Sequence, residues 1–334
     1  SVASTSNTRC AEGVARLINP MLGEPEPFVI VGAQVADGTG APLLAASVRV
    51  EGDTITQVGA VEPRETDHVI DATGLVLAPG FIDTHNHSTE GLDGDPDAVT
   101  QVSQGITTML LGQDGSSPWP VAEYLARRRA SPSAPNIAIL VGHATVRRQV
   151  MGDDFRRPAR PGELKRMEAL VDQGMREGAV GLSSGLEYEV GSHAETKELI
   201  ALARVAGRHD GFYISHIRDE ADRTLEAIRE AIAIGGRARI PVQVTHIKLG
   251  TVGVWGKAGE VVAIIETARK RGVDVTADAY PYLAWQADLK VLVPDKRYDN
   301  PASVKEALDD VGGGGNISVV RLPIFPQFAG KTLA

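Results

Sequence analysis

The sequence predicts an α/β protein built on a (β/α)8 TIM-type barrel, and three observations support this fold class. From residue 76 onward, apolar strand-like runs alternate with amphipathic helical stretches, which is typical of βα units around a parallel sheet. Most strand starts recur about every 30 residues, and no GxGxxG fingerprint follows the first strand, so a barrel is favoured over a doubly wound sheet. Five of the eight histidines lie at or just after the ends of predicted strands.

The chain before the barrel is organised differently. Residues 1–27 are rich in Ser, Asn, Gly and Pro, and we expect an irregular segment there, with at most one helical turn around residues 14–18. Residues 28–75 show short β-type runs separated by Asp-Gly and Gly-Asp turns, which predict a small antiparallel sheet. Its expected strands are Phe28–Gln34, Ser47–Glu51, Thr54–Val58 and His68–Asp71.

Residues 76–334 are expected to form the barrel. The predicted strands are Val76–Thr84, Ile106–Gly112, Asn136–Val141, Ala179–Ser183, Phe212–His216, Val242–His246 and Val273–Asp278. The pattern weakens in an insertion at about residues 284–330, where we expect a helix near 303–308 and an apolar run at 317–322. Because only seven good strands can be counted, we expect the eighth to be missing, the barrel to be open between its first and seventh strands, and the run at 317–322 to lie outside its wall.

Composition excludes several classes of function. The formal charge is −9, with 34 basic against 43 acidic residues, so the chain lacks the basic surface that nucleic acids require. No window holds eighteen consecutive apolar residues, which argues against a membrane span. Since Cys10 is the single cysteine, any metal must be held by histidines and carboxylates. We expect a cytoplasmic protein, and a periplasmic or secreted location after removal of a leader remains open.

Histidines at strand ends predict a metal site. His85 and His87 are two residues apart on an extended segment, so both side chains point to the same side and can bind one ion. His216 and His246 end two consecutive later strands, and parallel barrel strands all end on one face. Carboxylates follow other strand ends, at Asp83, Asp114, Glu187 and Asp278. The occurrence of these histidines together at strand ends favours a metal centre over the alternative that each is an isolated core or surface residue.

Sequence motifs narrow this prediction to a family. The segment Ala78-Pro79-Gly80-Phe81-Ile82-Asp83-Thr84-His85-Asn86-His87 resembles the first-strand motif of the amidohydrolase superfamily, whose members carry a small β-sandwich portion before the barrel. The later motifs are similar to those of the D-aminoacylase (N-acyl-D-amino-acid deacylase) family. They are Gln104-Gly105-Ile106-Thr107-Thr108, Gly142-His143 with Arg147, Gly181-Leu182-Ser183-Ser184-Gly185-Leu186, His216-Ile217-Arg218, His246-Ile247-Lys248 and Ala277-Asp278-Ala279-Tyr280-Pro281-Tyr282.

The resemblance implies an enzyme that hydrolyses the amide bond of a small-molecule substrate. The substrate would be an N-acyl-D-amino acid or a D-configured dipeptide, attacked by a zinc-activated water. It also implies one or two zinc ions, with His85 and His87 at one metal position and His216 and His246 at the other. The oligomeric state stays open.

A ligand is expected to bridge the two metal positions, and here the sequence departs from the family. The family carries a cysteine after the second strand, where this chain has Asp114. Glu187, which follows the fourth strand, is the other acid that can serve as the bridging metal ligand. We favour Glu187 and place Asp114 second, with a turn residue before Gly115 as the alternative interpretation of Asp114.

Further site residues follow from the same resemblance. Lys248 resembles the family's carboxylate-binding lysine, and Tyr280 and Tyr282 would flank it as substrate-binding hydrogen-bond donors. His143 is a candidate catalytic residue that either contacts the substrate or orients a metal ligand. Arg218, the second candidate, either binds a substrate acid or pairs with the neighbouring Asp219 and Glu220.

The family's general base, an aspartate at the end of the eighth strand, is not found in this chain. We therefore expect these 334 residues to be an incomplete enzyme. Two rival functions remain. A cyclic amidohydrolase of the dihydroorotase or hydantoinase kind would be expected to carry a bridging lysine after the fourth strand, but no lysine occurs between Lys165 and Lys197. The other rival is a non-catalytic metal-binding barrel that lacks its base.

Overall fold

The computed structural model describes residues 27–287, 289–293, 295 and 297–334. The expectation of an irregular start with one helical turn concerns residues 1–26, which lie outside this range. The described residues divide into two compact units. The first unit comprises residues 27–83, 90–109 and 126–138, and the second comprises residues 84–89, 110–125 and the chain from 139 onward.

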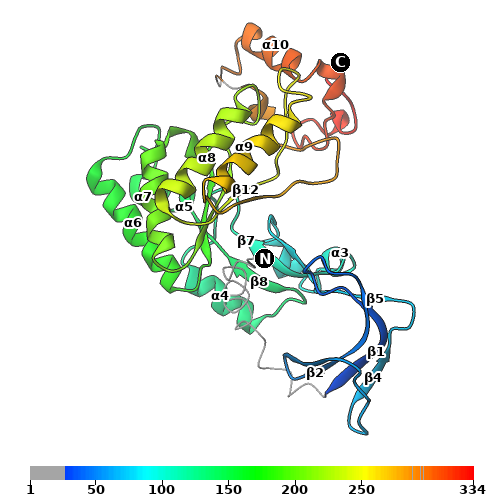
Figure 1. Ribbon diagram of the computed structural model, residues 1–334. Coiled ribbons are helices and arrows are strands. Elements are labelled where there is room, and N and C mark those ends of the chain that lie inside the picture. The colour runs from blue at the N-terminus through cyan, green and yellow to red at the C-terminus, as the bar shows by residue number, and fades with distance from the viewer. Residues whose placement is uncertain (1–26, 288, 294, 296) are drawn as a thin grey trace. The chain divides into compact units, whose positions relative to one another are not determined.

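A five-stranded sheet opens the first unit (Figure 1). Its strands are β1 (Phe28–Val35), β2 (Leu44–Glu51), β3 (Thr54–Gly59), β4 (His68–Asp71) and β5 (Val76–Leu77). The strands β1, β2 and β3 pair antiparallel as expected, but β4 and β5 both pair with β1 in parallel. The prediction of a purely antiparallel sheet is therefore wrong, because β3 and β4 do not form a hairpin and β4 instead joins the opposite edge of β1.

The predicted first barrel strand is two strands. β5 belongs to the N-terminal sheet, whereas β6 (Phe81–Asp83) pairs in parallel with β7 (Ile106–Leu111). Pro79 has no backbone N–H to donate, so the segment between them cannot continue a ladder. Gly80 is required there, since a Cβ on it would lie 2.1 Å from Thr107 Oγ1.

The three-stranded sheet has the order β6–β7–β8, with β8 at Asn136–Ile139. Three helices accompany this part of the chain: α2 (Gly91–Gly94), α3 (Val99–Val102) and α4 (Val121–Ala130). The apolar residues of β7 from Met109 to Leu111 are buried, which accounts for the continuous hydrophobic run in the sequence.

A five-stranded parallel sheet is the centre of the second unit. Its order is β13–β12–β11–β10–β9, and the strands are β9 (Val141–Gly142), β10 (Gly181–Gly185), β11 (Phe212–His216), β12 (Val242–Val244) and β13 (Val275–Ala277). Each neighbour in the sheet is also the next strand along the chain, as in a barrel wall. The register places His216 beside Gly185, so the strand ends carrying site residues lie at one edge.

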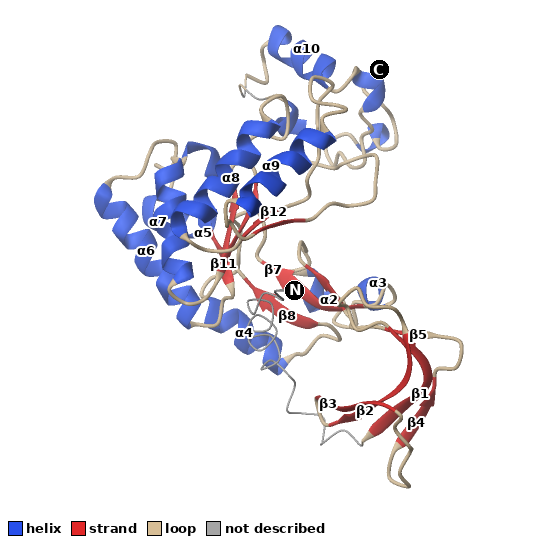
Figure 2. Cartoon of the chain, viewed as in Figure 1, coloured by secondary structure: helices blue, strands red, loops and turns tan. Residues whose placement is uncertain are grey.

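The helices that connect these strands lie on one side of the sheet (Figure 2). They are α5 (His143–Met151), α6 (Pro161–Arg176), α7 (Thr196–Gly207), α8 (Thr224–Ala238) and α9 (Ala258–Lys270), and the short η2 (Gly191–His193) precedes α7. The expected amphipathic character of these helices is confirmed, because Met167 and Val171 of α6, and Leu199 and Leu202 of α7, are fully covered. Burying one apolar stripe per helix on the sheet is what holds such layers together.

The chain after β13 forms short elements. They are η3 (Leu289–Leu292), α10 (Pro301–Asp310), η4 (Gly314–Asn316) and η5 (Pro326–Phe328), and α10 confirms the helix expected near residues 303–308. The run Ile317–Leu322 belongs to neither parallel sheet, because its one ladder contact is an isolated antiparallel bridge between Ser318 and Thr332. Across the part of the chain that the structure describes, no helix combines the length and apolarity needed to cross a lipid bilayer.

Candidate metal centre

The candidate ligands come from four strand ends and all lie in the second unit. His85 and His87 lie in the segment that follows β6, and Asp114 lies in the turn after β7. His216 is the last residue of β11, and His246 follows β12 by two residues. Parallel strands thus bring residues far apart in sequence to one edge of the sheet.

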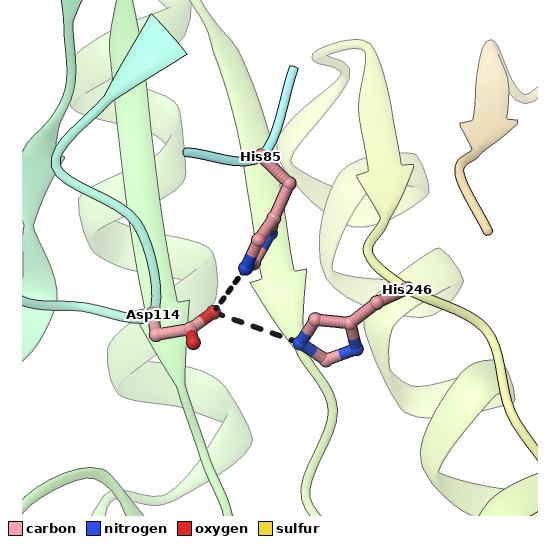
Figure 3. Close-up of side chains that lie close together, drawn as sticks. All are labelled: His85, Asp114 and His246. Atoms are coloured by element: carbon pink, nitrogen blue, oxygen red, sulfur yellow. Dashed lines mark ion pairs between the residues drawn. The ribbon is translucent and has the colours of Figure 1, made fainter. Parts of the chain in front are cut away.

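Asp114 points toward His85 and His246 (Figure 3). Its Oδ1 atom is 3.7 Å from His85 Nε2 and 3.9 Å from His246 Nε2, and its Oδ2 atom is 3.3 Å from His87 Nε2. The phenol of Tyr188 donates a hydrogen bond to Oδ2 over 3.4 Å and its ring packs on His216. Sequence reasoning missed Tyr188, for which the position next to Glu187 was the available signal.

The imidazole nitrogens approach one another in two pairs. His85 Nε2 lies 3.1 Å from His87 Nε2, and His216 Nδ1 lies 3.1 Å from His246 Nε2. Two nitrogens on one tetrahedral zinc ion lie roughly 3.3 Å apart, given Zn–N bonds of about 2.0–2.1 Å. Both pairs therefore have the spacing of ligands that share a cation.

The backbone around Asp114 is packed too closely for side chains. Asp114 itself has a φ of 57°, in the left-handed region that Asp tolerates better than most residues. A Cβ on Gly142 would lie 2.4 Å from the carbonyl oxygen of Gly115, and one on Gly185 would lie 2.4 Å from that of Asp114. We call the segment Asp114–Gly115 with these two facing glycines the glycine-clasped turn. It fixes the carboxylate relative to β9 and β10.

His246 is fixed at its backbone as well. Its φ of 33° is unusual for a residue with a side chain, and such conformations persist where the surroundings hold them. The N–H of His246 donates to Asp278 Oδ1, and the other oxygen of Asp278 accepts from Gln243 Nε2. Asp278, identified in the sequence as a strand-end acid, thus orients the segment that carries His246.

The electrostatics of the cluster favour the metal-binding forms of Asp114 and His85, whereas His216 is shifted toward its protonated form. Burial opposes ionisation of Asp114, but the hydrogen bond from His87 and the charges of the other histidines outweigh it and lower its pKa to about 2. Burial lowers the pKa of His85 to about 4, so its imidazole is neutral at pH 7. For His216, the hydrogen bond to Glu187 outweighs burial and raises the pKa.

Two further carboxylates approach the histidines from the other side. Glu187 Oε2 lies 2.9 Å from His216 Nε2, and Glu220 Oε1 lies 2.9 Å from His246 Nδ1. Asp114 approaches His85, His87 and His246, whereas Glu187 is hydrogen-bonded to His216. The geometry therefore favours Asp114 over Glu187 as the shared ligand. Sequence reasoning did not assign Glu220 to the site, although its position four residues after His216 was a usable signal.

The predicted substrate-binding residues lie beside Glu220. Lys248 Nζ forms an ion pair with Glu220 and lies 5.8 Å from the centre of the Tyr280 ring. The Tyr280 hydroxyl is buried and has no hydrogen-bond partner among the described residues, and burial raises its pKa to about 12. Tyr282 stacks on Tyr280 but is 73% exposed. Lys248 and Tyr280 are thus brought together, with Tyr282 at the periphery.

The two predicted catalytic residues lie in other clusters. His143 is the first residue of α5 and is fully buried, with its Nε2 atom 2.8 Å from Glu198 Oε1. Arg218 forms a two-pronged ion pair with Glu230 at 2.7 and 2.9 Å. The expected alternative pairing of Arg218 with Asp219 and Glu220 is therefore wrong, because the side chain extends toward α8, where Glu230 lies.

The donor set fits zinc. Histidine nitrogens and a carboxylate are preferred zinc ligands, and they converge here without a thiolate. Asp114 Oδ1 is buried and, among the described residues, makes no hydrogen bond. A buried carboxylate oxygen without a partner is costly, and a cation would satisfy it.

A small pocket adjoins Glu187 and Glu220. Its acidic side consists of these two residues and Asp310, and its apolar side includes Trp285 and Leu292. Ala221, Gly250, Thr251, Val291, Ala307 and Val311 complete the lining.

Comparison with known proteins relates this chain to amidohydrolases. The amidohydrolase family matches residues 68–327. The chain is 34% identical over 290 residues to D-aminoacylase of Alcaligenes xylosoxydans xylosoxydans, covering 80% of this chain and 60% of that protein. N-acyl-D-glutamate deacylase of the same organism is 35% identical over 291 residues, covering 80% and 59%. Dihydroorotase of Bacillus subtilis is 24% identical over 263 residues, covering 71% and 56%.

Solved structures of proteins with the same names also match this chain. A D-aminoacylase crystal structure matches with a TM-score of 0.78 at 33% identity, covering 92% of this chain and 66% of that one. N-acyl-D-glutamate deacylase from Bordetella bronchiseptica, solved with zinc and a phosphonate inhibitor, matches with a TM-score of 0.79 at 31% identity and the same coverage. The chain spans about three fifths of the length of the curated relatives it matches.

Proposed function

Because the chain belongs to the amidohydrolase family, with the mixed α/β fold of D-aminoacylase, we propose that it acts as a metal-dependent hydrolase on N-acyl-D-amino acids or D-configured dipeptides. The observation that carries this proposal is the convergence of Asp114 with three histidines from two other strand ends. The relatives named for D-aminoacylase and N-acyl-D-glutamate deacylase activity support the substrate class. The proposal includes a cytoplasmic location, which cell fractionation would test.

The metal in this proposal is zinc, as one or two ions. One metal position would be held by His85, His87 and Asp114. The other would be held by His216 and His246, with Asp114 as the ligand shared by both positions. Glu187 would stay hydrogen-bonded to His216. A bound zinc ion would supply a water of lowered pKa and would polarise the amide carbonyl of the substrate. The zinc-containing structure of N-acyl-D-glutamate deacylase supports the choice of metal.

The protein's own residues would bind and orient the substrate. Lys248 would pair with the α-carboxylate, and the buried Tyr280 hydroxyl would donate a hydrogen bond to the same group. Roles for Tyr282, His143 and Arg218 stay predictions. The contacts of His143 with Glu198 and of Arg218 with Glu230 favour indirect roles for both.

The pocket beside Glu220 would take the substrate side chain. It adjoins Gly250 and Thr251, which follow Lys248 closely in the chain, so a substrate held by Lys248 would present its α-substituent there. Its carboxylates would repel an acidic side chain, whereas Trp285 and Leu292 would contact an apolar one. We therefore expect neutral N-acyl-D-amino acids to be preferred over N-acyl-D-glutamate and N-acyl-D-aspartate.

Measured turnover tests the function directly. Hydrolysis of N-acetyl-D-leucine, N-acetyl-D-glutamate and N-acetyl-L-leucine would be followed by release of the free amine, with added zinc and after chelation. We expect zinc-dependent release from the D-leucine substrate. Equal rates on the L-isomer would contradict the D-specific assignment, and no turnover with zinc bound would favour the non-catalytic metal-binding alternative.

The cyclic amidohydrolase alternative has weaker support. Dihydroorotase is 24% identical to this chain, and the D-hydantoinase structure, with a TM-score of 0.55 at 16% identity, shares the fold alone. Ring opening of dihydroorotate or a hydantoin, assayed with the same zinc-loaded protein, separates the two functions.

A further inference from the structure

Glu220 occupies the side of His246 that faces away from Asp114. Its Oε1 atom lies 2.9 Å from His246 Nδ1. The other nitrogen of the same ring, Nε2, lies 3.1 Å from His216 Nδ1 and 3.9 Å from Asp114 Oδ1. One imidazole therefore has a carboxylate at one nitrogen and the candidate metal ligands at the other.

The position of one proton decides whether this ring can bind a metal. A neutral imidazole carries a proton on either Nδ1 or Nε2, and only the nitrogen without it can act as a ligand. A carboxylate beside Nδ1 accepts a hydrogen bond and so favours the form protonated there. That form leaves the Nε2 lone pair directed at His216 and Asp114.

Lys248 and Glu220 favour opposite tautomers of His246. Its Nζ atom lies 2.9 Å from His246 Nδ1 and also pairs with Glu220 Oε1. An ammonium group can only donate, so beside Nδ1 it favours the opposite tautomer, with the proton on Nε2. Glu220 opposes this effect by accepting both the ammonium and the Nδ1–H.

Glu220 is itself held in place. Its side chain is only 12% exposed, and its backbone N–H donates to Glu187 Oε1 over 3.3 Å. Its carbonyl oxygen accepts from the N–H of Gly250 at 2.9 Å, and a Cβ on Gly250 would lie 2.5 Å from that oxygen. The carboxylate therefore has little freedom to leave His246.

We propose that Glu220 is a positioning residue that selects the Nδ1-protonated tautomer of His246 and thereby sets the metal affinity of the centre. The inference rests on the proposed function in one respect, namely that His246 binds the metal. Carboxylates that accept from the second nitrogen of a ligating histidine act in this way in other metalloproteins. In this role Glu220 acts on the metal through His246 and is not itself a metal ligand.

The first test measures zinc affinity by competition with a chromophoric chelator. Glu220→Gln keeps the shape of the side chain but can donate to Nδ1, so we expect roughly 10- to 100-fold weaker zinc binding. Asp222→Asn is the matched control, because Asp222 lies in the same loop and bonds Thr251 Oγ1 at 2.7 Å. The control should bind zinc like the wild type. Equal affinity in Glu220→Gln and wild type would overturn the proposal.

The second test reads the tautomer without any metal. In protein labelled with ¹⁵N-histidine, long-range ¹H–¹⁵N spectra distinguish Nδ1-H from Nε2-H imidazoles, and the His246 signals are assigned by their loss in His246→Gln. We expect an Nδ1-protonated ring in the wild type and a shift toward Nε2-H in Glu220→Gln. Lys248→Met should retain the wild-type form. An Nε2-protonated wild-type ring would overturn the proposal.

A third measurement separates positioning from direct ligation. The visible spectrum of the Co²⁺-loaded protein reports the ligand set, so it should be the same for wild type and Glu220→Gln at saturating metal. A changed spectrum would make Glu220 a ligand and overturn the positioning role. If the wild type bound no zinc, the proposed function would fail, while the tautomer spectra would still decide what Glu220 does to His246.

Discussion

At the scale of single residues, Asp114 links candidate ligands that come from different strand ends. Its two oxygens face three histidines from two other strand ends, and one oxygen has no hydrogen-bond partner among the described residues. Glu187 is hydrogen-bonded to His216. The contacts therefore reverse the order in which the strand-end argument placed these two acids.

Replacing Asp114 should therefore disable metal binding more than replacing Glu187. We expect Asp114→Asn to reduce bound zinc to less than half of the wild-type content, because the amide loses the charge that holds the cation. Glu187→Gln should retain more than half. Metal content after gel filtration, measured by atomic emission, checks both variants. A larger loss in Glu187→Gln would restore Glu187 as the shared ligand.

The sequence predicted where the histidines lie in the fold better than where the acids point. Parallel strands end at one edge of their sheet, so the strand positions of His216 and His246 were enough to predict that the two residues lie at the same edge. Glu220 and Tyr188 lie in loops, where side-chain direction depends on tertiary contacts that no periodicity encodes. The contact of His143 with Glu198 could not be predicted from the sequence either, since 55 residues separate the two in the chain.

At the scale of elements, a buried ion pair joins α5 to α7. Arg147 is fully buried and donates from Nη1 to both oxygens of Glu198 at 2.6 Å, while its Nη2 atom donates to the carbonyl oxygen of Phe155. His143 contacts the same carboxylate. This cluster positions the helix that begins directly after β9.

Breaking this pair should be costly. Glu198→Gln leaves the Arg147 charge buried without its partner, and we expect a loss of about 3–5 kcal/mol in the free energy of unfolding. Urea denaturation followed by circular dichroism checks this. The double variant Arg147→Met with Glu198→Gln should lose less than the sum of the two single variants. Strict additivity would show that the pair is not coupled.

The start of α6 provides a prediction on pH. Glu163 accepts from the backbone N–H of Arg160 at 2.7 Å and from Arg157, and the hydrogen bond from Arg157 lowers its pKa from 4.5 to about 2. A lowered folded-state pKa contributes stability above the unfolded value and loses it as pH falls toward 2. Glu163→Gln should cost about 1 kcal/mol at pH 7.

The difference between wild type and Glu163→Gln should shrink with acidification. It should be constant above about pH 5 and decline between pH 4.5 and 2, as measured by urea midpoints at several pH values. A difference that grew with acidification would have the wrong sign for this mechanism. Among the element bounds, β11 matches its expected range, whereas the expected strand Asn136–Val141 divides into β8 and β9, which belong to different sheets.

At the scale of the whole molecule, the chain divides into two compact units, and every candidate ligand lies in the second. The periodic alternation of strands and helices predicted the parallel sheet of that unit, because each βα unit buries its own stripe. The division of the first predicted barrel strand into β5 and β6 was missed, since apolar residues flank Pro79 and Gly80 on both sides. The missing eighth strand stays a prediction.

Zinc should stabilise the two units unequally. At a free concentration of 100 times Kd, a ligand bound only by the folded state adds about 2.7 kcal/mol. We expect hydrogen exchange to slow at residues 110–117, 181–187 and 212–220 on addition of zinc, with residues 28–59 unchanged. Equal slowing in both regions would show that the metal stabilises the chain as one cooperative block.

The glycine-clasped turn has a consequence for laboratory evolution of this protein. Gly142 and Gly185 leave no volume for a methyl group beside the main chain of Asp114 and Gly115, so random mutagenesis there would mostly yield unfolded clones. The Asp114 side chain itself points away from this crowded main chain toward the histidines. A library restricted to position 114 could thus exchange oxygen for sulfur or nitrogen donors, at the cost of some backbone strain because a φ of 57° suits Asp better than most residues. Selection among variants of this one residue would then decide whether the site prefers hard or soft cations.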